Sequence, residues 1–201
     1  MNQQTRTGLT TVIATVLMMS EPALARERNP KLERVTLTVC VDDEAGVPAV
    51  FLTEAQARAA AVFRMRDIDV KWVSARDAIR LKLSRPFATL VIAEAPASPK
   101  SPASGREDNV MGQAVPWMNR AYVYYDRLLN VASPARDIVT TLGDVMAHEL
   151  GHLVLPSGHS PMGIMRSSID MMSRRIQTFT EAEAVELQQR LRKPSGSVET
   201  N

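Results

Sequence analysis

The sequence predicts an α+β domain whose N-terminal half follows an α/β pattern. Three observations favour this class. Short runs rich in β-branched residues alternate with a helical segment in the first half of the chain. A longer helical segment with two histidines follows in the second half, and a capped one lies near the C-terminus. The 201 residues are 45% hydrophobic, which is ordinary for one globular domain with a real core.

A strand, a helix and a strand open the predicted domain. Residues 34–41 alternate between apolar and polar side chains and are rich in valine and threonine, as expected of a strand. A T-x-x-Q pattern at Thr53 resembles a capping box and predicts an alanine-rich helix that ends near Met65. Residues 68–74 and 87–94 predict the second and third strands. This order favours a right-handed crossover and a parallel pair of strands.

A long loop and a fourth strand follow. Residues 95–119 contain several prolines, glycines and serines, which predict a flexible surface loop. Such a loop is either functional or a filler between elements. Residues 120–126 then predict a strand, because they alternate and contain all three tyrosines of the chain.

Two helices complete the predicted domain. Ser133 and the proline after it predict the start of a helix that ends at about Val154, before another proline. A T-x-x-E capping box at Thr180 predicts a last helix to about Leu191. The polar residues 194–201 predict a disordered tail.

The first 25 residues have the three parts of a secretory signal. Arg6 supplies a positive charge, residues 8–20 form an apolar run, and A-L-A at residues 23–25 is a small-x-small cleavage site. A membrane anchor is the alternative, but the apolar run is too short to span a bilayer as a helix. We therefore expect removal of residues 1–25, a secreted or periplasmic protein and no stable membrane insertion afterwards. Residues 26–201 are expected to form a single domain.

Charge and cysteine content exclude several classes of protein. The net charge of +2 is small and the chain has no long basic run, so neither nucleic acid nor an anionic membrane is expected as a partner. Cys40 is the one cysteine, which excludes an internal disulfide. Because Cys40 lies in an apolar alternating run, we expect a buried, unreactive thiol.

All three histidines of the chain lie within twelve residues. His148 and His152 enclose Glu149 in an H-E-x-x-H pattern, and His159 follows. Positions i and i+4 share one face of a helix, so the two imidazoles can bind one metal ion. His159 would complete three protein ligands and leave one position open, as in a catalytic zinc site. Glu149 would then take a proton from a zinc-bound water and pass it to the leaving amine. The alternative is two histidines on a helix surface that bind no metal.

Asp144 lies one turn before the first histidine. It can accept a hydrogen bond from a ligand imidazole, and an ordinary exposed position on the helix is the alternative.

Residues 148–165 resemble the metzincin clan of zinc peptidases, whose pattern is H-E-x-x-H-x-x-G-x-x-H followed by a methionine turn. The three histidines and Glu149 match the zinc ligands and the general base. Met165, in S-P-M-G-I-M, resembles the Met-turn methionine, which supports the ligands without binding zinc. The closest likeness is to small secreted bacterial metzincin-like proteins. The resemblance implies a twisted, mostly parallel sheet with one antiparallel edge strand, a backing helix, an active-site helix, the Met-turn and a C-terminal helix.

The sequence departs from that pattern in three ways. His159 lies eleven residues after the first histidine rather than ten, and Leu155 takes the place of the glycine. Pro156 would end the helix instead, and Gly158 would give the backbone freedom just before His159. Some metzincins also use a tyrosine two residues after the methionine, where this chain has Ser167. Should His159 not reach the metal, the alternative third ligand is a carboxylate of the last helix: Glu181, Glu183 or Glu186.

In the resembled fold, an edge strand lies above the zinc and pairs with an extended peptide. The resemblance implies that residues 120–126 form this strand, with Tyr122, Val123 and Tyr124 beside the substrate. The competing interpretation is a structural strand buried under the 95–119 loop. The expected partner is a peptide or protein substrate.

The sequence therefore predicts a secreted zinc-dependent endopeptidase. Zn²⁺ is the expected cofactor, and hydrolysis of peptide bonds is the expected reaction. A secreted zinc-stabilised binding protein with the same fold and little or no peptidase activity is the alternative, favoured by the displaced third histidine and by Ser167. A zinc hydrolase that acts on another amide or on cell-wall crosslinks is a third interpretation.

Overall fold

The computed structural model describes residues 34–80, 87–96, 110–131, 137–156, 158–168 and 175–193. Residues 34–201 form one unit. The predicted signal peptide, the predicted tail and the predicted helix start at Ser133 lie outside the described residues. Within the described part, no helix combines the length and the apolar character that crossing a bilayer requires.

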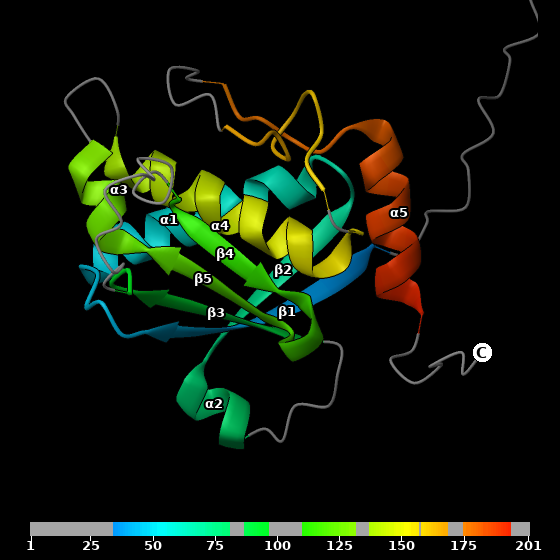
Figure 1. The fold of residues 1–201 in the computed structure, drawn as a ribbon. Helices are drawn as coiled ribbons and strands as arrows, with labels where there is room; N and C mark the ends of the chain where they lie inside the picture. The colour runs from blue at the N-terminus through cyan, green and yellow to red at the C-terminus, as the bar shows by residue number, and fades with distance from the viewer. Residues whose placement is uncertain are drawn as a thin grey trace, which may run out of the picture. The chain divides into compact units, whose positions relative to one another are not determined.

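A five-stranded sheet with the strand order β2-β1-β3-β5-β4 runs through this unit (Figure 1). β1, β2, β3 and β5 run parallel to one another, and β4 is antiparallel to β5 at one edge. The predicted mostly parallel sheet with one antiparallel edge strand is confirmed. The strands are β1 (Val35–Asp43), β2 (Ile68–Ser74), β3 (Phe87–Ala93), β4 (Gly112–Val115) and β5 (Arg120–Tyr124).

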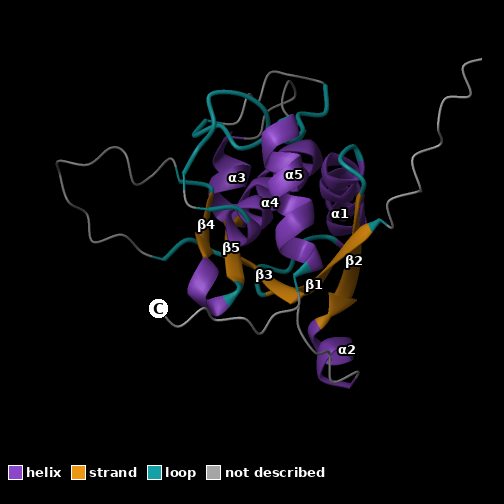
Figure 2. Ribbon diagram, turned by 90° about the vertical axis from the view of Figure 1, so that its right-hand side faces the viewer, coloured by secondary structure: helices purple, strands orange, loops and turns teal. Residues whose placement is uncertain are grey.

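Two long helices, α1 and α4, pack side by side over one face of the sheet, whereas the short helix α2 lies beyond the opposite face (Figures 1 and 2). α5 contacts α4 and β1. A 3-10 turn, η2, joins β4 to β5. The helical elements are α1 (Ala49–Arg64), α2 (Ala75–Arg80), η2 (Pro116–Met118), α3 (Tyr125–Val131), α4 (Ile138–Val154) and α5 (Glu181–Arg192).

Alternation along the strands places apolar side chains beneath α1 and α4. On β1, Leu37, Val39 and Val41 are buried on this face, and Leu90 of β3 lies in register beside Val41. Burying one such Leu or Val side chain stabilises the fold by about 1.5–3 kcal/mol. Cys40 alternates to the other face and is buried, as predicted. The two helices complete the core with Ala55, Ala59, Val62, Phe63, Leu142, Val145, Met146 and Leu150.

The edge strand is not the one that the sequence predicted. Residues 120–126 were expected at the edge, but β5 lies between β3 and β4, and it ends at Tyr124, where α3 follows from Tyr125. The outermost strand on this side of the sheet is β4, and β2 is outermost on the other side. β4 lies inside the region 95–119 that was predicted as a loop. Its sequence, G-Q-A-V, is too short to alternate visibly, and the glycine and proline around it are typical of loops. The prediction of the edge strand was wrong for this reason.

Helix starts were predicted less well than helix ends. α1 begins at Ala49, and the hydroxyl of Thr53 donates to the carbonyl of Ala49 instead of capping the helix. α4 begins after Asp137, whose carboxylate accepts hydrogen bonds from two backbone N–H groups of the first turn. The capping box at Thr180 is confirmed, and α5 follows it. α2 and α3 were not predicted, since six or seven residues are too few to show a helical period.

Candidate metal centre

α4 carries three polar side chains of the candidate site. His148 and Glu149 are each 6% exposed, and His152 is half-buried. Asp137 caps the first turn, and apolar residues hold the helix against the sheet. One turn separates His148 from His152, so both rings leave α4 on the same side.

His159 reaches the other two histidines. One ligand atom from each of the three rings lies within 4.8 Å of the others, and this is the one group of its kind in the part of the chain that the structure describes. Nε2 of His148 and Nε2 of His152 are 3.0 Å apart. The ring centroid of His159 lies 5.3 Å from that of His148 and 4.9 Å from that of His152. The alternative ligands are engaged elsewhere, Glu181 with Arg66, Glu183 with the N–H of Thr180 and Glu186 with Arg190.

The extra residue between the second and third histidines is accommodated after the end of α4. Leu155 is extended, and its N–H donates to the carbonyl of Gly151. Gly158 has a φ of 134°, a conformation that favours glycine. The N–H of Ser160 donates to the carbonyl of Met165 at 2.8 Å, which closes the segment after His159 into a loop. The displaced histidine is therefore brought back toward α4.

The geometry and protonation of the histidines suit a metal ion. Nδ1 of His148 donates to the carbonyl of Ile164 at 2.7 Å, which leaves Nε2 free as a ligand. Burial lowers the pKa of His148, and burial together with the two neighbouring histidines lowers the pKa of His152 to about 4. Neutral imidazoles are the form that binds zinc, and Zn–N bonds of about 2.0–2.1 Å put two tetrahedral ligand nitrogens about 3.3 Å apart. The residues present therefore fit a zinc ion with three protein ligands.

Glu149 lies between α4 and the outermost strand. A β-carbon at Gly112 of β4 would lie 2.6 Å from Oε1 and 2.7 Å from Cγ of Glu149. The carboxyl group thus occupies this place because position 112 has no side chain. Burial raises the pKa of Glu149 to about 8, and a cation bound nearby would lower it again. Beside such a cation the ionised carboxylate can accept a proton from water and donate it again.

Met165 lies directly beneath α4. It is buried, and a β-carbon at Gly151 would lie 2.5 Å from its Sδ and 2.9 Å from Cε1 of Phe179. The glycine in H-E-L-G-H is therefore the residue that lets the methionine approach the helix between the two histidines.

The turn at Gly163 and Ile164, just before Met165, packs against and is hydrogen-bonded to Thr178, in the segment that leads into α5. Gly163 has a φ of 76°, and a β-carbon there would lie 2.5 Å from the carbonyl oxygen of Thr178. The N–H of Ile164 donates to the same carbonyl at 3.0 Å. This anchoring fixes the Ile164 carbonyl at the place where it accepts from His148.

The residues predicted to line the substrate strand belong to β5, an inner strand of the sheet. Val123 is fully buried, and the hydroxyl of Tyr124 donates to Gln113 on β4 at 3.2 Å. Tyr122 shares β5 with them, and both edges of β5 are paired. The backbone of Tyr122, Val123 and Tyr124 is therefore engaged, and among the described strands β4 is the one that lies at this edge.

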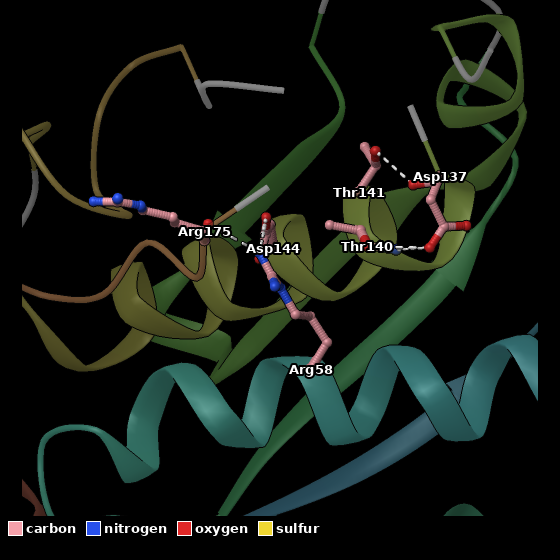
Figure 3. A network of polar contacts seen from close by, with 6 residues as sticks. All are labelled: Arg58, Asp137, Thr140, Thr141, Asp144 and Arg175. Atoms are coloured by element: carbon pink, nitrogen blue, oxygen red, sulfur yellow. Dashed lines mark hydrogen bonds and ion pairs between the residues drawn. The ribbon is translucent and has the colours of Figure 1, made fainter. Parts of the chain in front are cut away.

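Asp144 is neither exposed nor a partner of a ligand histidine. Its two carboxylate oxygens accept from Arg58 of α1 at 2.8 and 3.0 Å, and Arg58 also donates to the carbonyl of Arg175 at 3.4 Å (Figure 3). Burial raises the pKa of Asp144, and the Arg58 guanidinium opposes this shift. The pair joins α1 to the helix that carries the candidate site.

The sequence did not predict that Gly112 leaves room for Glu149, nor that the Ile164 carbonyl accepts a hydrogen bond from His148. A glycine inside a strand indicates a close approach of another group, but β4 itself was not recognised. A backbone carbonyl gives no signal at all, since every residue carries one.

Neither a protein-family model nor a curated protein sequence matches this chain. Among solved structures, the fold is similar to the crystal structure of archaemetzincin from Methanopyrus kandleri, with a TM-score of 0.50 and 18% sequence identity over 82% of this chain and 99% of that one. At this identity the likeness shows the fold alone. The chain has a metzincin-like fold, as the motif resemblance predicts.

Proposed function

We propose that this protein is a secreted zinc-dependent endopeptidase. The observation that carries the proposal is the convergence of His148, His152 and His159 beside Glu149, which lies against the outermost strand of the sheet. Three neutral imidazoles and a carboxylate that can act as a general base are the groups that metal-assisted hydrolysis requires. The metzincin-like fold supports the proposal, because it brings these groups next to a free strand edge.

The side chains have separate tasks in this reaction. Zinc, when bound, would supply the positive charge that polarises a carbonyl and activates water. The Ile164 carbonyl orients His148, so the direction of its Nε2 is fixed. Glu149 accepts a proton from the attacking water and gives it to the nitrogen of the amine that leaves. Burial of Glu149 between α4 and β4 raises its pKa, and the positive charge of a bound zinc ion would lower it again, so that the ionised carboxylate accepts the proton.

The substrate would be an extended peptide that pairs with the free edge of β4. In the part of the chain that the structure describes, Gly112–Val115 pairs with β5 on one side and has no strand on the other. Its outer N–H and C=O groups can therefore bind the main chain of a peptide. This proposal moves the substrate strand from residues 120–126 to residues 112–115.

Metal analysis combined with a peptide-library assay tests the proposed activity. The protein should bind one zinc ion and cleave internal bonds of long peptides. Glu149→Ala should keep the zinc and lose the activity, because it removes the proton carrier and no ligand. Leu129→Ser, an exposed position on α3, serves as the matched control and should behave as the wild type. Identical behaviour of zinc-loaded wild type and Glu149→Ala across a broad library would overturn the proposal.

Secretion is tested separately, by N-terminal sequencing of exported protein. Cleavage after the A-L-A site would give a mature chain that begins at Arg26. Protein that stays in the cell with residues 1–25 intact would contradict this part of the proposal.

A secreted zinc-stabilised binding protein is the second candidate. Ser167 favours it, since this exposed serine stands where some metzincins have a tyrosine that assists the reaction. Such a protein would melt at a lower temperature after His159→Ala or removal of zinc, yet the zinc-loaded wild type would cleave no peptide. Peptide cleavage that is lost in Glu149→Ala would support the peptidase and contradict the binding protein.

A further inference from the structure

We infer that the substrate of the proposed peptidase is an extended polypeptide with a large apolar side chain about four or five residues before the bond that is cut, and that Trp117 binds this side chain. The inference rests on the proposed function and adds the substrate class to it. It follows from the position of Gly112, the length of β4 and the exposure of η2.

Gly112 sets the register of a peptide on β4. The place of its missing β-carbon is 2.6 Å from Oε1 of Glu149, so the carboxylate packs directly against this residue of the strand. Proton transfer requires the carboxylate to approach the reacting atoms to about 2.6–3.2 Å. A peptide on the edge of β4 therefore presents the bond to be cut close to Gly112.

β4 continues from Gly112 to Val115 and then enters η2. At a rise of about 3.3 Å per residue, Val115 lies about 10 Å beyond Gly112, which is the length of about three residues of extended peptide. Trp117 follows Val115 by two residues, in the turn that leads into β5, so a fourth or fifth peptide residue comes within its reach. Antiparallel pairing is the more stable ladder, and in it the residues that precede the cut bond run toward Trp117.

The surface at this end of β4 is apolar. The side chain of Trp117 is 82% exposed and that of Met118 is 54% exposed. Trp117 has the highest exposed fraction of the large hydrophobic side chains in the described residues. Two adjacent exposed apolar side chains at the end of a strand with one open edge form a contact surface, and tryptophan is among the residue types that contribute most at such surfaces.

The backbone beneath these side chains is fixed. The N–H of Asn119 donates to the carbonyl of Pro116 at 3.0 Å, and the carbonyl of Asn119 accepts from the N–H of Thr89 on β3 at 2.8 Å. Asn119 itself has a φ of 50°, which turns the chain into β5. Trp117 is thus presented on a hydrogen-bonded turn, and little ordering of the backbone is needed when a substrate binds.

Other exposed apolar residues provide the controls. Leu129 on α3 and Val185 on α5 are 52% and 54% exposed, and neither belongs to β4 or η2. Scattered exposed apolar residues are ordinary. Leu129→Ser therefore removes a similar apolar side chain without touching the proposed contact surface.

The test compares two peptides that differ at one position. Both contain the same cleavable bond, and one has leucine or phenylalanine at the fourth and fifth residues before it, where the other has serine. Zinc-loaded wild type should cleave the apolar peptide with a kcat/KM about tenfold higher, the size of effect that an aromatic contact provides. Trp117→Ser should abolish the preference through KM rather than kcat, Trp117→Phe should retain most of it, and Leu129→Ser should leave it unchanged.

A binding measurement separates this inference from the proposed function. Zinc-loaded Glu149→Ala and the double variant Glu149→Ala/Trp117→Ser are titrated with both peptides by fluorescence anisotropy. If the wild type cleaves nothing while Glu149→Ala binds the apolar peptide through Trp117, the peptidase proposal fails, and of the inference only the binding of an apolar peptide side chain by Trp117 stands. The same preference in wild type and Trp117→Ser overturns the inference. An apolar preference confined to residues after the cut bond, or no binding of either peptide, overturns it as well.

Discussion

The sulfur of Met165 lies where a side chain at Gly151 would begin: a β-carbon at position 151 would be 2.5 Å from Sδ. Gly151 sits between the two histidines of α4, and Met165 follows the third histidine in the sequence. This contact joins the two halves of the candidate site. It also gives a physical reason for glycine in the H-E-L-G-H segment, where helix propensity alone would favour another residue.

Gly151→Ala should destabilise the protein and weaken zinc binding. The added methyl group has to displace Met165 and Phe179 from a packed interior, and such overpacking costs about 1–3 kcal/mol. Urea denaturation with and without zinc measures both effects. Val185→Ser, at an exposed position, is the control and should change neither property. A substitution at Gly46 is unsuitable, because its φ of 70° would strain any other residue. A fully stable Gly151→Ala protein with unchanged zinc affinity would show that the contact has no such role.

Gly112→Ala should impair hydrolysis while zinc binding is retained. The methyl group would overlap Oε1 and Cγ of Glu149, and the carboxyl group would have to turn away. Misplacement of a catalytic group by about 1 Å can reduce the rate about 100-fold. Isothermal titration with zinc and a peptide-cleavage assay measure the two properties. Gln113→Ala removes the hydrogen bond from Tyr124 but adds no atom beside Glu149, so it measures the effect of a change in the strand itself.

The elements that carry strong local patterns were predictable from the sequence. The strand at residues 68–74 was predicted with its bounds, and α4 ends at Val154 as predicted. The capping box at Thr180 also has its expected hydrogen bonds. These features depend on neighbours in sequence, which is why pattern and propensity suffice.

The features that depend on contacts between distant segments were not predictable. β4 has four residues without a visible period, and its identity as a strand rests on pairing with β5. Asp144 is buried because Arg58, on another helix, pairs with it. Gly112 matters because Glu149 lies against it. Each case is decided by a partner far away in the sequence, which a local pattern does not contain.

Asp144→Ala should destabilise the fold far more than the loss of a surface ion pair. Arg58 and Asp144 are both largely buried and 2.8 Å apart, so the variant leaves a buried guanidinium without its carboxylate. Breaking such a pair costs about 3–5 kcal/mol. Glu186→Ala, which breaks the exposed pair with Arg190 on α5, should cost about 0.3–0.5 kcal/mol. Denaturant unfolding of both variants tests this difference, and equal losses would contradict it.

Zinc should raise the unfolding free energy of the wild type, and His159→Ala should reduce this gain. A ligand that binds only the folded state stabilises it by about 2.7 kcal/mol when its concentration is 100 times the Kd. Because His159 is one of three convergent imidazoles, its removal should weaken zinc binding, and the gain at a fixed zinc concentration should fall. Thermal melts of both proteins over a zinc series, with EDTA as the metal-free reference, give the comparison. Equal zinc dependence would show that His159 is not a ligand.

The most direct test is a crystal structure of the zinc-loaded protein, with the metal located by its anomalous signal. We expect one zinc ion about 2.0–2.1 Å from a ring nitrogen of His148, His152 and His159, and a fourth position that faces Glu149 and is free of protein side chains. A structure in which His159 points away from the ion, or in which a protein side chain fills the fourth position, would contradict the proposed hydrolytic site.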